Sequence, residues 1–480
     1  MERRASAVVC GLLLCISSVF AEATKPGVTR ADLALALQRF EKAFLDHRPQ
    51  GENLVKANLA FEEVTQNFFR MNFSAAIGQL NKAALELSLG PKPTEQEVWL
   101  ASLKVVVDPP VAGPKCAAPV VHLWEMAPGA GSTRYPFELV LKQGDKQKRF
   151  PVTPNEEKGT EVAAVPITGD WAGTWNIHVA YPKGLDFDSG RRLIVVPFDV
   201  DERRAENAKR LAQVAESPKD LAAALATCRA RNELLKSTPS EASSTEFLSD
   251  PNVLAAEIAD EIKALEAGKN PYFHRTGDYW RVMTRGSSKV PMRVYVPKTL
   301  DLNKPVPLVV ALHGAGGDEN MFMDAYGLGK VKREADRKGF IVVSPATFYL
   351  LTRSENLAGL IDEMKACYPI DPKRIYVLGH SMGGGATAKL ASEKADLIAA
   401  ASCIAGFRGF STKTICPTYI LSAELDAIVP KDVIEQGAQQ AIKEGLPVTY
   451  KSIPSYGHTM VVEAELPEVI DWLFKHVREK

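Results

Sequence analysis

The sequence lacks an excess of charge of either sign, because Lys plus Arg and Asp plus Glu both number 58 among its 480 residues. A protein that binds nucleic acid or an anionic membrane through its surface field usually carries a net positive charge. We therefore expect no nucleic acid and no anionic membrane as the main partner. The composition also indicates neither an acidic nor a basic substrate.

Hydrophobic runs that approach the length of a membrane span are almost absent as well. The exception is the stretch ASAVVCGLLLCISSVF, which follows Arg3 and Arg4 and precedes small residues suited to signal-peptidase cleavage. We interpret residues 1–23 as a signal peptide, which predicts a secreted or periplasmic protein with no stable membrane insertion after cleavage. The alternative is a single N-terminal membrane anchor, which needs about 20 apolar residues.

Cysteine is scarce, and its spacing shows no paired pattern. After the expected cleavage five cysteines remain, and none forms the Cys-x-x-Cys pair of a zinc site: Cys116, Cys228, Cys367, Cys403 and Cys416. This excludes a disulfide scaffold and a cysteine-rich metal site. One disulfide among the last three cysteines and buried free thiols both stay open.

At this length the chain should contain about three folding units. Residues 24–95 have helical periodicity, since Leu33, Leu37, Phe40 and Phe44 recur at intervals of three and four residues. This spacing predicts a helical region whose apolar stripe faces a core.

Short β-branched and aromatic runs between turn residues fill 98–200, which predicts an all-β, sandwich-like domain. Its tryptophans Trp124, Trp171 and Trp175 either fill the core of the sandwich or form a flat platform for carbohydrate, and we favour the core. Contact with a polysaccharide or with the cell envelope through the front domains stays the alternative.

Helical patterns return over 201–268, although the Ser-rich and Thr-rich stretch 237–249 is expected to be a loop. Neither this region nor the first helical region offers a large core by itself. We therefore hypothesise that 201–268 packs with 24–95 in one bundle.

From about 270 to 480, near-continuous apolar runs alternate with helical segments. Strands that are buried on both faces have this composition, and the alternation predicts an α/β fold with a mainly parallel sheet flanked by helices. Two runs at its start, 278–284 and 292–297, suit an antiparallel edge.

A G-x-S-x-G motif occupies 379–383, between an expected buried strand and an expected helix. In that context the serine stands on a strained turn that exposes its hydroxyl, and the glycines let strand and helix approach. Ser381 is therefore the candidate nucleophile. A serine hydroxyl needs a base to take its proton and a third group to orient that base.

The acid and the histidine follow the serine in this fold, each beyond a later strand. Asp426 follows the next-to-last expected strand and His458 follows the last one. Glu424 is the weaker alternative for the acid, because it lies closer to its strand. His476 falls in the C-terminal helical segment, so His458 is the candidate base.

The oxyanion of a tetrahedral intermediate needs preorganised N–H donors. The segment LHGAGG follows an expected strand, and it supplies the backbone N–H of Ala315, while the residue after the serine supplies that of Met382. His313 in the same segment is expected to fix the loop rather than to act as a base.

On the motifs LHGAGG, YPIDPKRIYVLGHSMGG, the aspartate loop and GHT, residues 270–480 resemble the α/β-hydrolase superfamily. They are most similar to its esterase branch, which includes feruloyl esterases, acetylxylan esterases and polyhydroxyalkanoate depolymerases. The resemblance implies a serine esterase that needs no metal and no cofactor. The segment 370–375 also resembles the lead-in strand of prolyl-oligopeptidase-type peptidases, but no propeller-like repeat precedes it.

Only 45 residues separate Ser381 from Asp426, which leaves no room for a large lid between them. We therefore expect an open site that accepts a small-molecule or polymer ester. Two loops are candidates to frame it, and their residues Phe348, Tyr349, Phe407 and Arg408 either form its wall or pack within the loops; both interpretations stay open.

Together these patterns predict an exported serine hydrolase that cleaves carboxylic esters through a Ser-His-Asp triad and an acyl-enzyme intermediate. Two alternatives stay open. One is a serine peptidase of the prolyl-oligopeptidase type, and the other is an envelope-associated binding protein with an inactive hydrolase domain.

Overall fold

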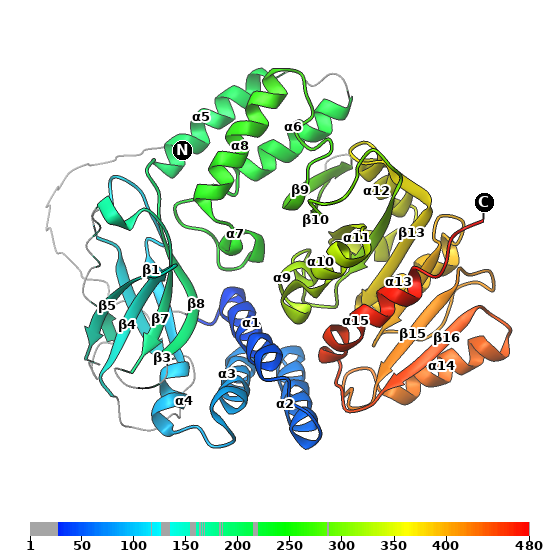
Figure 1. The fold of residues 1–480 in the computed structure, drawn as a ribbon, viewed down its shortest axis with the longest axis horizontal. Coiled ribbons are helices and arrows are strands. Elements are labelled where there is room, and N and C mark those ends of the chain that lie inside the picture. The colour runs from blue at the N-terminus through cyan, green and yellow to red at the C-terminus, as the bar shows by residue number, and fades with distance from the viewer. Residues whose placement is uncertain are drawn as a thin grey trace, which may run out of the picture.

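The computed structural model describes residues 27–479 except 117, 126–134, 154–159, 163–164, 166, 168, 182–183, 185, 215–218 and 286–287. The expected signal peptide, 1–23, lies outside the described residues. The molecule has four parts, which are two groups of helices, a β-sandwich and an α/β part with a large sheet. The β-sandwich and the large sheet lie at opposite sides, and α1 and α7 lie between them (Figure 1).

The first part is helical, as its periodicity predicts. Thr29 starts the first helix with a capping box, in which its side chain accepts from the backbone of Asp32 and the Asp32 side chain accepts from Thr29. The helices are α1 (Arg30–His47), α2 (Glu52–Phe69), α3 (Phe73–Leu89) and the short α4 (Glu95–Ala101).

The second part consists of two sheets that enclose one apolar core. One sheet has the order β1-β3-β6 and the other the order β2-β8-β7-β4-β5. The elements are β1 (Leu103–Asp108), β2 (Val111–Ala112), β3 (Val120–Glu125), β4 (Phe137–Gln143), β5 (Lys146–Val152), β6 (Thr160–Val162), the 3-10 helix η1 (Gly169–Trp171), β7 (Gly173–Ala180) and β8 (Asp186–Val195).

The tryptophans of this part do not form a shared platform. Trp171 and Trp175 are 3% and 0% exposed and pack on each other inside the core, and only Trp124 is half-buried. Burial in the core was the favoured interpretation, and it is confirmed for these two residues.

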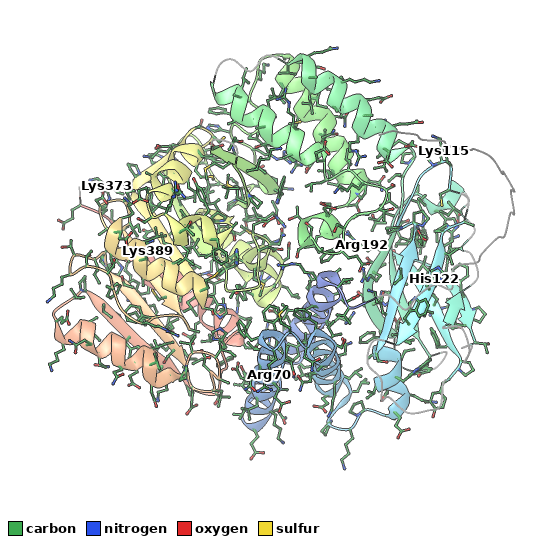
Figure 2. All side chains as sticks on the ribbon, turned by 180° about the vertical axis from the view of Figure 1, so that it is seen from behind. Arg70, Lys115, His122, Arg192, Lys373 and Lys389 are labelled. Atoms are coloured by element: carbon green, nitrogen blue, oxygen red, sulfur yellow. The ribbon has the colours of Figure 1, made fainter. Side chains whose placement is uncertain are left out.

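The third part contains the remaining front helices: α5 (Val200–Gln213), α6 (Lys219–Asn232), α7 (Ser244–Leu248) and α8 (Pro251–Glu266). The expectation of a plain loop over 237–249 is wrong, because Ser243 caps α7 by accepting from the backbone of Glu246. Arg192 of β8, labelled in Figure 2, lies beside this short helix and donates to the carbonyl oxygen of Phe247 at 2.7 Å.

The single bundle expected from the two helical regions does not form. The apolar side chains of α1, α2 and α3 make a cluster of their own, together with Met460. Those of α5, α6 and α8 belong to the core of the large sheet, where Thr227 of α6 donates to the carbonyl of Val282. The two regions meet at α7 and at the turn before it, where the backbone N–H of Ala31 donates to the carbonyl of Glu241. Helical periodicity indicates that one face of a helix is buried, but it does not indicate which element covers that face. The prediction that the two helical regions cover each other was therefore wrong.

The fourth part is an eight-stranded sheet of order β16-β15-β14-β13-β11-β12-β10-β9. Its strands from β11 to β16 run parallel, and β10 and β9 form the antiparallel edge that was expected. The strands are β9 (Gly277–Arg285), β10 (Ser288–Val296), β11 (Val306–Leu312), β12 (Ile341–Pro345), β13 (Ile370–His380), β14 (Ala400–Ile404), β15 (Thr418–Ala423) and β16 (Val448–Ile453).

Helices connect these strands and cover the sheet, whose central strands β11, β12, β14 and β15 are buried along their whole length. The helices are α9 (Met321–Asp324), α10 (Tyr326–Lys338), α11 (Thr347–Thr352), α12 (Asn356–Lys365), α13 (Met382–Glu393), α14 (Lys431–Lys443) and α15 (Met460–Leu473). The α/β fold predicted for 270–480 is therefore confirmed.

All five cysteines from Cys116 onward are free in the structure, and four of them are buried. Among the described residues, no helix combines the length and the apolar character that a membrane span requires.

Candidate active site

Ser381 stands where strand β13 ends and helix α13 begins. Its backbone has φ 55° and ψ −117°, a conformation that costs energy for a residue with a side chain. The turn also depends on close backbone approach: a Cβ atom on Gly379 would lie 2.2 Å from the carbonyl oxygen of Gly383, and one on Gly383 would lie 2.0 Å from that of Leu312. The motif thus forms the strained turn that the sequence predicted.

A chain of hydrogen bonds connects this serine to a histidine and an aspartate. The Ser381 hydroxyl lies 2.9 Å from Nε2 of His458, and Nδ1 of His458 lies 2.8 Å from Oδ2 of Asp426. The other carboxylate oxygen of Asp426 accepts from the backbone N–H groups of Ile428 and Val429, both at 2.8 Å. His458 and Asp426 are 2% and 7% exposed, so the protein rather than water fixes their orientation.

The loop after β11 lies beside the serine. A Cβ atom on Gly314 would lie 3.2 Å from Cβ of Ser381, and Ala315 lines the same pocket as Ser381. Met382 is the first residue of α13, and the N–H groups of a first helical turn have no acceptor within their own helix. Both residues proposed as oxyanion donors therefore flank the serine.

His313 has the position expected of a residue that fixes the loop. Its Nε2 accepts from the backbone N–H of Thr347 at 3.0 Å, and its carbonyl accepts from the Thr347 hydroxyl at 3.0 Å. Burial lowers its pKa. Glu424, the alternative acid, instead accepts from the backbone of Ser455, and His476 packs on the ring of Trp472.

The candidate wall residues do not line the pocket at Ser381. Phe348 is 62% exposed, Phe407 is buried against Phe410, and neither they nor Tyr349 and Arg408 border the cavity. The wall comes from elsewhere in the chain.

A pocket of about 500 Å³ lies at Ser381 and His458, and its far wall is formed by α1, α2 and α3. The expectation of an open site is met only in part, because helices wall one side of the pocket although no large cover lies between Ser381 and Asp426. Counting residues between the serine and the aspartate excluded a lid only at that place in the chain, whereas the cover comes from the N-terminal helices, which precede the serine by about 300 residues.

Two polar residues of α2 contact the loops that hold the histidine and the aspartate. The carboxylate of Glu62 accepts from the backbone N–H of His458 at 2.6 Å and from that of Ala427 at 2.8 Å. Asn58, one turn earlier, accepts from the backbone N–H of Gly457 at 2.9 Å. Burial raises the pKa of Glu62, and the nearby Asp426 raises it further, although the backbone N–H groups oppose them.

Sequence reasoning missed both residues. Their signal was present, since Asn58 and Glu62 are one turn apart on the side of the helix that also carries the buried Phe61 and Thr65. Polar residues on a buried helical face require partners.

His380, the residue before the serine, also supports the site. The Tyr326 hydroxyl lies 2.7 Å from its Nδ1, and its Nε2 lies 2.8 Å from the carbonyl oxygen of His458. Since the carbonyl can only accept, Nε2 carries the proton and Nδ1 accepts from the tyrosine. Burial holds the pKa of His380 well below its usual range, so the ring is neutral.

A mainly parallel sheet with a serine on the turn after a central strand, and with acid and histidine after later strands, defines residues 277–473 as an α/β-hydrolase domain. Residues 360–459 match the family model described as PET hydrolase-like. These residues include Ser381, Asp426 and His458. The region therefore has the fold of the α/β-hydrolases, and part of it is similar in sequence to the PET hydrolase-like family.

Several curated proteins are similar to part of this chain. Cutinase 1 of Thermobifida cellulosilytica is 36% identical over 104 residues, which are 19% of this chain and 39% of the cutinase. The bifunctional acetylxylan esterase/xylanase of Neocallimastix patriciarum is 35% identical over 133 residues, 26% of this chain and 18% of that protein. The chain thus spans less than half the length of each of these relatives.

Among solved structures, a thermostable esterase aligns with a TM-score of 0.38 and 17% identity, over 78% of this chain and 100% of that one.

Proposed function

We propose that this chain is an exported serine hydrolase that cleaves carboxylic esters. The observation that carries the proposal is the chain of hydrogen bonds from Ser381 through His458 to Asp426, located on the strained turn at the start of α13. The partial relatives named as cutinase and acetylxylan esterase support ester chemistry.

In the proposed reaction the Ser381 oxygen attacks the ester carbonyl carbon while Nε2 of His458 takes the hydroxyl proton. Asp426 keeps the ring in the tautomer that can accept at Nε2. The carbonyl oxygen becomes an oxyanion, which accepts from the N–H groups of Ala315 and Met382. The bond to the leaving oxygen then breaks, the alcohol departs with the proton from His458, and an acyl-enzyme remains.

Water completes the cycle. His458 takes a proton from a water molecule while the water oxygen attacks the acyl carbon. His458 then gives this proton to the Ser381 oxygen as the carboxylic acid leaves. Ser381, His458 and water account for every proton, so the proposed mechanism uses neither a metal nor a cofactor.

Export is proposed from the sequence of residues 1–23, and contact of the β-sandwich with a polysaccharide or an envelope stays a second proposal. The test is binding of labelled fragment 98–200 to insoluble cellulose, xylan and chitin. If none of the three retains the fragment, the polysaccharide contact is contradicted.

The test of the function is hydrolysis of p-nitrophenyl acetate, p-nitrophenyl butyrate, methyl ferulate and alanyl-p-nitroanilide. We expect ester turnover that Ser381→Ala lowers at least about 10⁴-fold, because the nucleophile is lost. Ser392→Ala is the matched control, since Ser392 lies on the same helix and only donates to the carbonyl of Ala388. It should change turnover less than twofold.

Two outcomes would overturn the proposal. Faster turnover of the anilide than of any ester would indicate a peptidase. No turnover, with no labelling of Ser381 by a fluorophosphonate, would indicate a binding protein with an inactive hydrolase domain.

A further inference from the structure

The helices that cover the site present apolar surface to the pocket. Leu33 and Leu37 of α1 line it and are only half-buried, whereas Phe40 and Phe44 on the same stripe are buried in the helical core. One end of the stripe thus stabilises the bundle. The other end leaves aliphatic surface uncovered in a concavity beside the candidate nucleophile.

Phe68 of α2 brings this wall up to the loop that follows β11. A Cβ atom on Gly316 would lie 2.1 Å from Cζ of Phe68, so the ring stands directly on the loop next to Ala315. Phe68 also packs on Phe73 of α3. An acyl or alkoxy group bound at Ser381 therefore meets aromatic and aliphatic side chains on the helical side.

The charges at the pocket wall are already paired. Arg30 and Asp318 lie 3.0 Å apart, and Asp324 lies 2.8 Å from Arg293. His380 is neutral because burial lowers its pKa. No charged side chain among these is left to attract a charged substituent, and an ionised group placed against Leu33 and Leu37 would lose its hydration.

We propose that the pocket selects small, uncharged esters that carry a bulky apolar group, and that this group lies against α1, α2 and α3. The inference rests on the proposed function and narrows it. A pocket of about 500 Å³ is the size that encloses a compact organic molecule. Because helices wall the side that faces Ser381, a small ester fits the site better than the middle of a polymer strand.

The experiment measures kcat/KM for p-nitrophenyl acetate, butyrate and octanoate on the full chain, at substrate concentrations below micelle formation. Each methylene that is buried adds up to about fourfold to transition-state binding. We expect the ratio of octanoate to acetate to be at least about tenfold. Matched esters with a terminal carboxylate should be at least about tenfold poorer than their uncharged counterparts.

Two variants of Leu37 test the wall. Leu37→Asp places a charge on it and should lower the ratio of octanoate to acetate at least about fivefold, and the milder Leu37→Ala should lower it about threefold. Leu59→Ala is the control, because Leu59 lies on α2, is 47% exposed and does not border the pocket. Titration with a fluorophosphonate normalises each rate to the number of folded sites.

The outcomes separate this inference from the proposed function. Ser381-dependent hydrolysis with a flat chain-length profile, or an unchanged ratio in both Leu37 variants, would overturn the pocket assignment alone. Faster Ser381-dependent release from a suspended polyester than from octanoate, per site, would also overturn it. Absence of Ser381-dependent turnover on every ester would overturn the function itself.

Discussion

Asp426 and Glu424 stand two residues apart in one loop, yet their surroundings differ. Asp426 is 7% exposed and divides its oxygens between His458 and two backbone N–H groups, whereas the exposed Glu424 accepts only from the backbone of Ser455. A buried carboxylate that orients a ring cannot be replaced by a solvated one nearby. The two residues therefore provide a matched pair for testing the acid assignment.

We expect Asp426→Asn to lower kcat on p-nitrophenyl butyrate by about 10³- to 10⁴-fold with little change in KM. The new amide group either places a donor against the Nδ1–H of His458 or forces the other tautomer, which cannot accept the proton of Ser381. Glu424→Gln should keep kcat within twofold. Steady-state kinetics of both variants provide the test. A larger loss of kcat in Glu424→Gln than in Asp426→Asn would assign the acid to Glu424.

The positions of individual site residues could be predicted from the sequence, because the carboxyl ends of parallel strands meet at one edge of a sheet. Ser381, Asp426 and His458 each follow such a strand, so their order along the chain indicated their proximity. Glu62 followed no such rule. It comes from a helix almost 400 residues from His458, and no local pattern states which distant backbone a carboxylate will contact.

Among the elements, helix α2 contacts the loops of the candidate site from outside the hydrolase domain. Glu62 joins the aspartate loop to the histidine loop, since each of its oxygens accepts from one of them. A Cβ atom on Gly457 would lie 2.2 Å from Oε1 of Glu62, so the glycine gives the helix the room to come this close. We infer that Glu62 is a positioning residue.

Glu62→Gln should lower kcat about 10- to 100-fold, because glutamine has one acceptor oxygen and its NH₂ group must face a backbone N–H. A displacement of about 1 Å at a reacting group has costs of this size. We expect KM to change less than threefold. Glu63→Gln is the control, as the neighbouring Glu63 is exposed and bonds only within the helices, to Gln79.

Thermal unfolding of both variants distinguishes positioning from a general loss of structure. A purely structural role for Glu62 would lower the number of sites titrated by a fluorophosphonate in proportion to kcat. Positioning leaves that number intact while kcat per site falls.

The helices themselves were easier to predict than their partners. Periodicity located α1, α2 and α3, and the alternation of runs located the strands of the large sheet. However, Leu33 and Phe40 belong to one apolar stripe and differ in their surroundings: Phe40 is buried in the bundle core, whereas Leu33 packs at the edge of that core and also lines the pocket. The spacing of hydrophobic residues does not indicate which of them face the bundle core and which face the pocket. The helical wall over the site was therefore not predicted.

For the whole molecule, α1 connects the β-sandwich with the hydrolase domain through charged groups. Asp32 contacts Lys104 of β1 at 2.8 Å and also pairs with Arg191 of β8. Arg30 pairs with Asp318 of the hydrolase domain, and Glu41 accepts from the backbone N–H of Leu328 at 3.1 Å. Because the cover and the sheet are tied together by ionisable groups, their association should depend on pH.

Glu41 is the group whose titration should be visible. It is 1% exposed, and burial raises its pKa to about 7 from the usual 4.5, with Glu463 adding to the rise while Leu328 and Lys330 oppose it. The folded protein therefore binds this proton more tightly than the unfolded chain does between about pH 4.5 and 7. Its contribution to the free energy of unfolding is complete below that window and is lost as pH rises through it, by about 3 kcal/mol at most.

Glu41→Gln resembles the protonated side chain, since its amide oxygen can still accept from Leu328 while no charge is buried. We expect its Tm to match that of the wild type near pH 5 and to exceed it by several degrees at pH 8, because only the wild type pays for ionisation there. Thermal unfolding over this pH range measures the difference, with Asp46→Asn, an exposed carboxylate on the same helix, as the control. Parallel Tm curves for the wild type and Glu41→Gln would show that Glu41 does not control how the N-terminal helices are held on the hydrolase domain.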